Sequence, residues 1–298
     1  MNIAIVSSTK DIASTNIKEN LINNFDFNKL DEKFDNNNIY QHIINNEKNN
    51  KIIIKLFTIN SELIFTDDLD NKIDADVFVY ISRHRAQEGR ASLTCHNIGN
   101  FGKAKHGGKE KTLCYSDSFL LKNIFIELNN NVKEPYEVTS EATHHGPYME
   151  KRVLFVELGS NEEYWKDEEG GKIIAKSLIN AFENYNKTIN NNSNEIINNN
   201  ESKDNGNHGF ESVFLIGGSH YSHVANKAML KGNIAVGHIC AKYNLPDLDE
   251  DLIKDAMEKC KAKLVLLDWK GLGKEKARIV EILKKNSIPY KRSDQVMY

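Results

Sequence analysis

The chain has 298 residues, of which 40% are hydrophobic and 27% charged, an ordinary balance for a globular protein with one large or two small domains. No apolar run reaches the roughly 18 residues needed to span a bilayer, and the first residues lack the pattern of a signal peptide, so we expect a cytoplasmic protein. The net charge of -3 argues against strong non-specific binding to nucleic acid.

Short β-branched runs alternate with helical patterns along the chain. Buried strands are predicted at residues 3–6, 52–57, 77–81, 153–158, 213–216 and 264–267. Apolar residues recur at three- and four-residue spacing in 11–25, 117–128, 171–185, 251–261 and 274–285, which predicts helices. This alternation predicts an α/β fold with a mixed or largely parallel sheet flanked by helices.

Two Asn-rich tracts, 36–50 and 186–207, interrupt the alternation. The second tract has almost no apolar residues, so it is expected to be a flexible surface insertion. The chain is therefore divided into an N-terminal α/β part (1–185), the insertion (186–207) and a C-terminal α/β part (208–298), the two α/β parts being expected to belong to one fold.

A basic segment runs from Arg83 to Lys111, although the whole chain is mildly acidic. Only Glu88 and Glu110 oppose its seven cationic residues, which are Arg83, Arg85, Arg90, Lys103, Lys105, Lys109 and Lys111. Such a local basic surface suits a negatively charged partner that is recognised at one place. A solvated charged loop is the alternative interpretation.

Seven of the ten histidines lie in short motifs that contain Gly, Ser or Asn. These motifs are SRHR (82–85), CHNIGN (95–100), THHGP (143–147), GGSHYSH (217–223) and GH (237–238). Several follow a predicted strand, and ligands of open α/β sheets bind beyond the carboxyl ends of the strands. Neutral imidazoles together with a carboxylate are the usual ligands of zinc, so these motifs predict a functional site.

The candidate catalytic residues are Glu141, His144 and His145, with Glu141 as a metal ligand or general base. The candidate metal ligands are His144, His220, His223 and His238; we expect His220 and His223 to share one face at a helix start. A hydrogen-bonded structural role is the alternative for any single histidine.

Glycines after two predicted strands suggest anion binding. Backbone N–H groups at Gly217, Gly218 and Ser219 could hold an anion, and Lys270 in DWKG (268–271) could face a phosphate, although a tight turn explains both motifs equally well. The candidate substrate-binding residues are Arg83, His84, Arg85, His96, Gly217, Gly218, Ser219 and Lys270.

The sequence offers no covalent nucleophile. It has no GxSxG motif, and its four cysteines are scattered without a CxxC pair and are expected to be small buried residues. Attack by a water that a metal or a histidine activates is therefore favoured.

In combination and in order, SRHR, HNIGN (96–100), EATHHGP (141–147), GGSHYSH, GH and DWKG resemble the archaeal and plant type of D-aminoacyl-tRNA deacylase over nearly the whole chain, with the Asn-rich tracts as departures. The resemblance implies hydrolysis of the ester between a D-amino acid and the tRNA 3′ end, with broad side-chain tolerance, which counteracts D-amino acid toxicity. It also implies two Zn²⁺ ions per subunit, a monomer, and a phosphorylase/hydrolase-like fold. The basic segment would then meet phosphates of the acceptor end of D-aminoacyl-tRNA.

Two other functions remain open from the sequence. A zinc-dependent peptidase or amidohydrolase on a similar fold would act on free peptides. A non-catalytic tRNA-binding protein would use its histidines to contact phosphates or to stack on bases.

Overall fold

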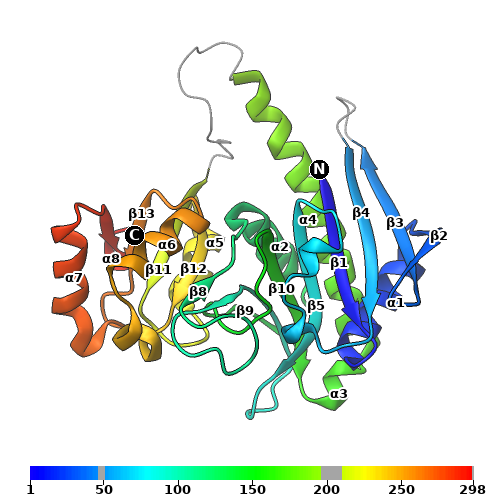
Figure 1. The fold of residues 1–298 in the computed structure, drawn as a ribbon, viewed down its shortest axis with the longest axis horizontal. Helices are drawn as coiled ribbons and strands as arrows, with labels where there is room; N and C mark the ends of the chain where they lie inside the picture. The colour runs from blue at the N-terminus through cyan, green and yellow to red at the C-terminus, as the bar shows by residue number, and fades with distance from the viewer. Residues whose placement is uncertain (46–50, 196–209, 297–298) are drawn as a thin grey trace.

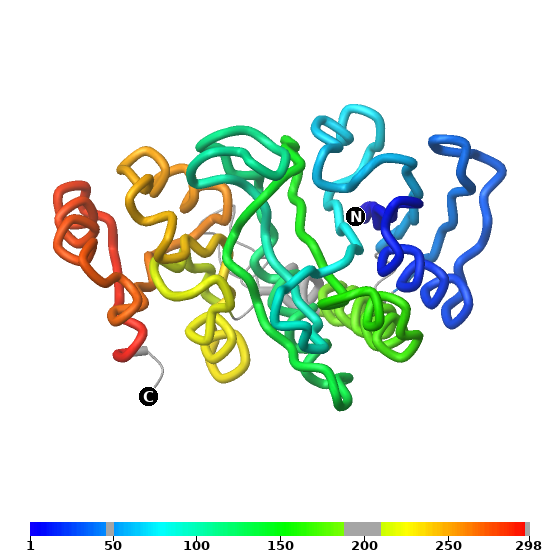
Figure 2. Tube along the Cα trace, turned by 90° about the horizontal axis from the view of Figure 1, so that it is seen from below, coloured from blue at the N-terminus to red at the C-terminus, as the bar shows by residue number. Residues whose placement is uncertain are grey.

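The structure is a computed structural model that describes residues 1–45, 51–195 and 210–296. Figure 1 shows a large sheet and a small sheet side by side, with helices packed on both, and Figure 2 shows the same arrangement from below. The predicted α/β class, with a mixed and largely parallel sheet, is confirmed.

The large sheet has eight strands. Their spatial order is β2 (Asn28–Phe34), β3 (Asn37–Asn45), β4 (Lys51–Ile59), β1 (Asn2–Ser8), β5 (Val77–Arg85), β10 (Arg152–Ser160), β6 (Ser92–Asn97) and β9 (Glu137–Ser140). The four central strands β4, β1, β5 and β10 are parallel, whereas β6 runs antiparallel to β10 and parallel to β9. The carboxyl ends of the central strands therefore meet at one edge of the sheet.

The small sheet is entirely parallel, in the order β12 (Ile234–Cys240), β11 (Glu211–Ile216), β13 (Leu264–Leu267) and β14 (Tyr290–Arg292). A two-stranded ladder of β7 (Gly99–Asn100) and β8 (Thr112–Leu113) completes the β-structure of the described residues.

One hydrophobic core continues beneath both sheets. On the large sheet it is covered by α1 (Ile12–Asn24), α2 (Ser118–Asn131) and α4 (Glu168–Glu195), and α2 also packs on β12 beside α5 (His223–Lys231). Val213 and Leu215 of β11 point into this shared core, while Phe214 and Ile216 point to the other face, as the two-residue period of a strand requires. That other face is covered by α6 (Glu250–Lys259) and α7 (Lys276–Lys285).

Short elements complete the chain. They are the helices α3 (Glu162–Trp165) and α8 (Ser293–Val296) and the 3-10 turns η1 (Leu63–Phe65), η2 (Leu69–Asn71), η3 (Lys242–Asp247) and η4 (Gly273–Glu275). All four cysteines are buried and unpaired, as expected. None of the helices in the described ranges has both the length and the apolar character that a membrane span needs.

The prediction of a flexible insertion at residues 186–207 is wrong for its first ten residues. Helix α4 continues through them to Glu195, and Asn186 is only 4% exposed. Extending a helix that is already packed adds one hydrogen bond for each residue fixed, so weakly helical residues can continue it. Residues 196–207 lie outside the described residues. The first tract also contains structure, because β3 occupies Asn37–Asn45.

The segment after β9 joins the two sheets. Ser222 donates a backbone hydrogen bond to Ser140 O at 3.1 Å, and Thr143 donates one to Ile239 O at 2.9 Å. Glu141 also forms an isolated antiparallel bridge with Tyr221. These bonds fix Glu141 and its neighbours at the junction of the large and small sheets.

Candidate active site

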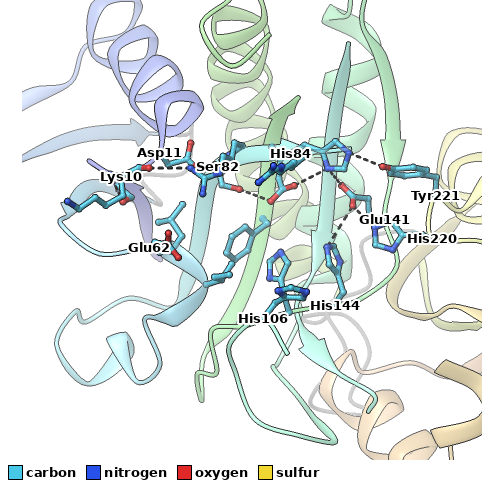
Figure 3. Close-up of a pocket in the computed structure, with 18 residues that line it drawn as sticks. Lys10, Asp11, Glu62, Ser82, His84, His106, Glu141, His144, His220 and Tyr221 are labelled. Carbon is cyan, nitrogen blue, oxygen red and sulfur yellow. Dashed lines mark hydrogen bonds and ion pairs between the residues drawn. The ribbon is translucent and has the colours of Figure 1, made fainter. Parts of the chain in front are cut away.

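A cavity of about 510 Å³ opens at the carboxyl ends of β1 and β5, beside the junction of the two sheets. Lys10, Arg83 and Arg85 lie in its lining together with the carboxylates of Glu62 and Glu141. In Figure 3, Lys10, Asp11 and Glu62 lie on one side of the cavity, and His220 and Tyr221 lie on the opposite side.

Three histidines gather at the cavity, with one ring nitrogen of each within 4.8 Å of the others: His96 on β6, and His144 and His145 after β9. Each Nδ1 faces a backbone carbonyl oxygen. His96 Nδ1 lies 3.1 Å from Asn97 O, His144 Nδ1 lies 2.7 Å from Ala142 O, and His145 Nδ1 lies 2.6 Å from Gly146 O. A carbonyl only accepts, so each Nδ1 carries a proton, and in the neutral form of each ring Nε2 keeps a free lone pair. Backbone carbonyls that fix the tautomer in this way are typical partners of metal-binding histidines.

The backbone around these rings is itself constrained. His145 has a φ of 49°, a left-handed conformation that is uncommon for a residue other than glycine. Gly99 N donates to His145 O at 3.0 Å, and Gly146 N donates to His106 O at 3.0 Å, so both neighbouring peptide groups are anchored. Residues held in such conformations concentrate at functional sites.

The electrostatics keep two of the rings neutral. Burial, together with the nearby His96, lowers the pKa of His145 to about 4 and that of His144 well below its usual value. Burial also opposes a charge on His96, but the Glu157 carboxylate, 3.7 Å from its Nε2, raises the pKa of His96. Without a metal the protonated form of His96 is therefore favoured, and its Nε2 must lose that proton before it can bind a metal.

Two buried carboxylates and His84 form the floor of the site. His84 Nδ1 lies 3.1 Å from Glu141 Oε1 and 3.3 Å from Glu157 Oε2, and its Nε2 lies 2.9 Å from the Tyr221 hydroxyl. Burial alone would lower the pKa of His84, but the two carboxylates raise it to about 11. Burial would raise the pKa of Glu141, yet its contacts with His220 and His84 hold that pKa well below the usual range.

His220 completes the constellation from the small-sheet side. Its Nε2 lies 2.8 Å from Glu141 Oε2, and its Nδ1 lies 3.0 Å from the Tyr243 hydroxyl. Glu141, His144 and His220 therefore form a second group that could hold a metal, and His84, Glu141 and Glu157 form a third. Because His144 has only one free ring nitrogen, it can serve a single ion at a time.

The donor set fits a metal ion. Among the described residues, neither His96 Nε2 nor Glu141 Oε1 forms a hydrogen bond, although both are buried. Their contacts are ion pairs, at 3.7 Å to Glu157 Oε1 and 3.1 Å to His84 Nδ1 respectively. Leaving a buried polar atom unsatisfied costs about 1–3 kcal/mol, a cost that a bound cation would offset. Three neutral imidazole nitrogens are also a known ligand set for catalytic zinc.

The structure brings most of the predicted residues to this place. Glu141, His144, His145, Arg83, His84, Arg85 and His220 line the cavity, and His96 lies directly behind it against His144 and His145.

The predicted metal set of His144, His220, His223 and His238 does not assemble. His223 is exposed at the first residue of α5, so His220 precedes the helix and does not share a helical face with it. His238 is fully buried with both ring nitrogens engaged, 3.2 Å from Thr143 Oγ1 and 2.9 Å from Cys114 O. The alternative of a hydrogen-bonded structural histidine therefore fits His238.

The glycine motifs lie outside the cavity lining. The Asp268 carboxylate faces the Gly217–Gly218 turn so closely that a Cβ added to Gly218 would lie 2.8 Å from Asp268 Oδ2. Asp268 Oδ1 accepts a hydrogen bond from Gly271 N at 2.9 Å. A carboxylate at this turn disfavours an anion, and Gly218 has a φ of 88° that suits glycine. Ser219 Oγ donates to Tyr221 O, and Lys270 is exposed to solvent. The tight-turn alternative fits these residues.

Several residues of the site were missed from the sequence, chiefly Glu157, Tyr221, Lys10 and Glu62. Glu157 is the one charged residue in the apolar run 153–158, and that departure from the strand pattern was an available signal. Tyr221 stands inside the GGSHYSH motif. Lys10 and Glu62 reach the cavity from loops, for which the sequence held no comparable signal.

The chain was compared with known proteins. The model of the D-aminoacyl-tRNA deacylase family matches residues 71–291. The D-aminoacyl-tRNA deacylase of Thermococcus kodakarensis is 33% identical over 90% of the chain and 91% of its own length, and that of Pyrococcus abyssi is 31% identical over 94% and 95%. The crystal structure of a conserved protein of unknown function, AF0625, superposes with a TM-score of 0.80 at 28% identity, covering 100% of this chain and 96% of that protein.

The match of the family model and the extent of these identities agree with the order of the histidine motifs along the sequence. The chain belongs to the D-aminoacyl-tRNA deacylase family.

Proposed function

We propose that the protein hydrolyses the ester bond of D-aminoacyl-tRNA, releasing a free D-amino acid and tRNA. Family membership supports this activity. The observation that carries it in the structure is the convergence of one ring nitrogen each from His96, His144 and His145 beside the buried carboxylate of Glu141.

We propose zinc as the metal and His96, His144 and His145 as the residues that hold one ion. When bound, zinc would supply a water of lowered pKa and polarise an ester carbonyl. A second ion, which the resemblance of the motifs implies, would be held by Glu141 and His220, whose present contact at 2.8 Å would then give way to bonds to the metal. His144 is left out of that second set because its one free nitrogen is already used.

Glu141 is proposed as the general base. Its Oε1 forms an ion pair with His84 Nδ1 at 3.1 Å but accepts no hydrogen bond from a described residue, so a lone pair remains that can accept a proton from water. Its Oε2 is held by His220 at 2.8 Å. The water oxygen bonds to the acyl carbon, the bond from that carbon to the ribose oxygen breaks, and the proton passes to the ribose oxygen. His84, held between the two carboxylates, keeps Glu141 in place.

The cationic wall of the cavity is proposed to hold phosphates of the tRNA acceptor end. Arg83 and Arg85 end strand β5 beside the catalytic residues, and Lys10 follows β1 on the same side. Phosphate contacts position a nucleic acid without reading its sequence, which suits an enzyme that acts on many tRNAs. The open cavity of about 510 Å³ is in keeping with broad side-chain tolerance.

We further propose that the protein acts as a monomer in the cytoplasm and counteracts D-amino acid toxicity. The test is hydrolysis of matched D- and L-tyrosyl-tRNA alongside simple peptides. Faster cleavage of the D-ester with no peptide cleavage is expected. Cleavage of peptides but not of the tRNA ester would favour a peptidase or amidohydrolase, and tRNA binding without cleavage would favour a binding protein.

A further inference from the structure

We propose that the exposed ring of Phe65 is the surface on which the terminal base of the tRNA acceptor end stacks. This inference rests on the proposed function and adds to it the place where the substrate's last nucleotide docks. Phe65 has the highest exposed fraction, 58%, among the large hydrophobic side chains of the described residues. An exposed aromatic ring offers a flat apolar face on which a base can stack.

The turn that carries Phe65 is firmly anchored at the cavity. Leu63 of η1 is buried in the core on one face of the large sheet, and both Leu63 and Ile64 line the cavity. Phe65 N donates to Glu62 O at 3.2 Å, which closes the turn. The ring of Phe65 is therefore presented at the rim of the cavity by a fixed backbone.

Two further segments meet this turn at the rim. A Cβ on Gly107 would lie 1.8 Å from Ile64 O and 3.3 Å from the ring of Phe65, so the two backbones touch. A Cβ on Gly146 would lie 2.7 Å from Ile64 O and 2.2 Å from Gly108 N. Because Gly146 directly follows His145, the Phe65 turn is packed against the loop that carries the proposed zinc ligands.

The rim carries charges of both signs, with exposed carboxylates at Glu62, Asp67 and Asp68 on the Phe65 turn and cations on the neighbouring loop. Lys103 and Lys105 are exposed in the loop that leads to Gly107, and neither forms an ion pair with a described residue. His106, between Lys105 and Gly107, lines the cavity and is drawn at its lower side in Figure 3. An exposed aromatic ring beside free cations is the combination with which proteins bind single-stranded nucleic acid, through stacking and phosphate contacts.

The position of the ester in the substrate determines which base can stack on Phe65. The ester is attached to the ribose of the last nucleotide, so when that ester is at the histidines the attached base must lie within one sugar of them. A ring at the rim, on a turn that packs against the histidine loop, satisfies this requirement. Tyr243 is also exposed, by 55%, and its hydroxyl is bonded to His220 Nδ1. We assign the base to Phe65 because the Phe65 turn packs against the loop that carries His145.

The kinetic test uses Phe65→Ala and Phe65→Leu, which remove the aromatic face, and Phe65→Tyr, which keeps it. Ile43→Ala, at a 42%-exposed position on β3, is the matched control. Substrates are D-tyrosyl-tRNA, 3′-O-D-tyrosyl-adenosine and D-tyrosine methyl ester. Loss of one stacked base is expected to raise KM by roughly 5- to 150-fold for the first two substrates in the Ala and Leu variants, with kcat little changed.

For the methyl ester, which has no base, all the variants are expected to match the wild type, and Phe65→Tyr should match it on every substrate. An unchanged KM for D-tyrosyl-tRNA in Phe65→Ala would overturn the inference. So would an equal loss on the methyl ester, which would mean that the substitution disturbs the cavity itself.

A binding measurement separates this inference from the proposed function. An uncharged acceptor-stem RNA with 2-aminopurine as its last base reports stacking by loss of fluorescence. Wild type and Ile43→Ala should quench it, and Phe65→Ala should not. If the wild type quenches the reporter but cleaves no ester, the deacylase activity is contradicted and the stacking site stands; if Phe65→Ala quenches like the wild type, the stacking site is contradicted.

Discussion

Replacing His96 by leucine, and comparing it with the same change at His238, separates metal ligation from structural hydrogen bonding. Both rings are buried, at 1% and 0% exposure, and both sit at the junction of the two sheets. They differ in how their nitrogens are used. His96 Nε2 has no hydrogen-bond partner in the described structure, whereas both nitrogens of His238 are bonded.

The expected stabilities of the metal-free proteins follow from this difference. His96→Leu removes one hydrogen bond, to Asn97 O, which is worth about 1 kcal/mol, but it also removes an unsatisfied buried nitrogen that costs about 1–3 kcal/mol. The free energy of unfolding should therefore be unchanged or higher by up to about 2 kcal/mol. His238→Leu leaves Cys114 O without its donor and the Thr143 hydroxyl without its acceptor, although Thr143 Oγ1 still accepts from Ile239 N, and it should cost about 2–4 kcal/mol.

The activities should rank in the opposite order. His96→Leu loses a proposed zinc ligand, and several kcal/mol of transition-state stabilisation correspond to at least a roughly 100-fold fall in kcat/KM. His238→Leu should keep its zinc and most of its activity at temperatures where it stays folded. Urea unfolding of chelator-treated proteins, zinc analysis and deacylation of D-tyrosyl-tRNA measure the three quantities. A His96→Leu protein that retains zinc and activity, or that is destabilised as much as His238→Leu, would refute the reasoning.

Three further results are expected. Glu141→Gln should lower kcat by about 10²- to 10⁴-fold with little change in KM, as loss of a general base does, and a change confined to KM would assign Glu141 to binding. Combined Arg83→Ala and Arg85→Ala substitutions should reduce the slope of the logarithm of the tRNA binding constant against the logarithm of salt concentration by about 1.4, roughly 0.7 for each lost phosphate contact. Arg90→Ala, outside the cavity lining, is the control and should leave this slope unchanged. An unaltered slope in the double variant would mean that the tRNA binds elsewhere. Burial lowers the pKa of His238 to about 4, so as the pH falls from 6.5 the unfolded chain binds a proton at His238 before the folded protein does. This difference should lower the free energy of unfolding of the metal-free protein by about 3 kcal/mol between pH 6.5 and pH 4. Urea unfolding across this pH range should show a smaller loss of stability for His238→Leu than for the wild type. An equal loss in the two proteins would contradict the role of His238 in the pH dependence.

The regular elements were predictable because each has a local cause. All six predicted strands and five predicted helices are present, since β-branched runs and three-to-four-residue periodicity reflect burial directly. The extent of α4 was not predictable, because its last turns follow from a helix already packed and not from their own Asn-rich composition.

The meeting of the predicted residues at one place was easier to foresee than the contacts of each ring. The structure brings Glu141, His144 and His145 to the cavity because the segment after β9 lies at the edge of the large sheet. Which histidine can bind a metal depends on what its other nitrogen contacts, and those partners are distant in sequence. His238 is bonded to Cys114 O, 124 residues away, and no local pattern reveals such a contact.

The central claim is that His96, His144 and His145 hold the metal with which the protein hydrolyses D-aminoacyl-tRNA. Its most direct test is zinc titration into chelator-treated protein while cleavage of matched D- and L-tyrosyl-tRNA is followed. We expect no cleavage without metal and recovery in proportion to zinc, with the D-ester cleaved much faster than the L-ester. Full activity in demonstrably metal-free protein would contradict the metal site, and equal rates on the two esters would contradict the assigned substrate.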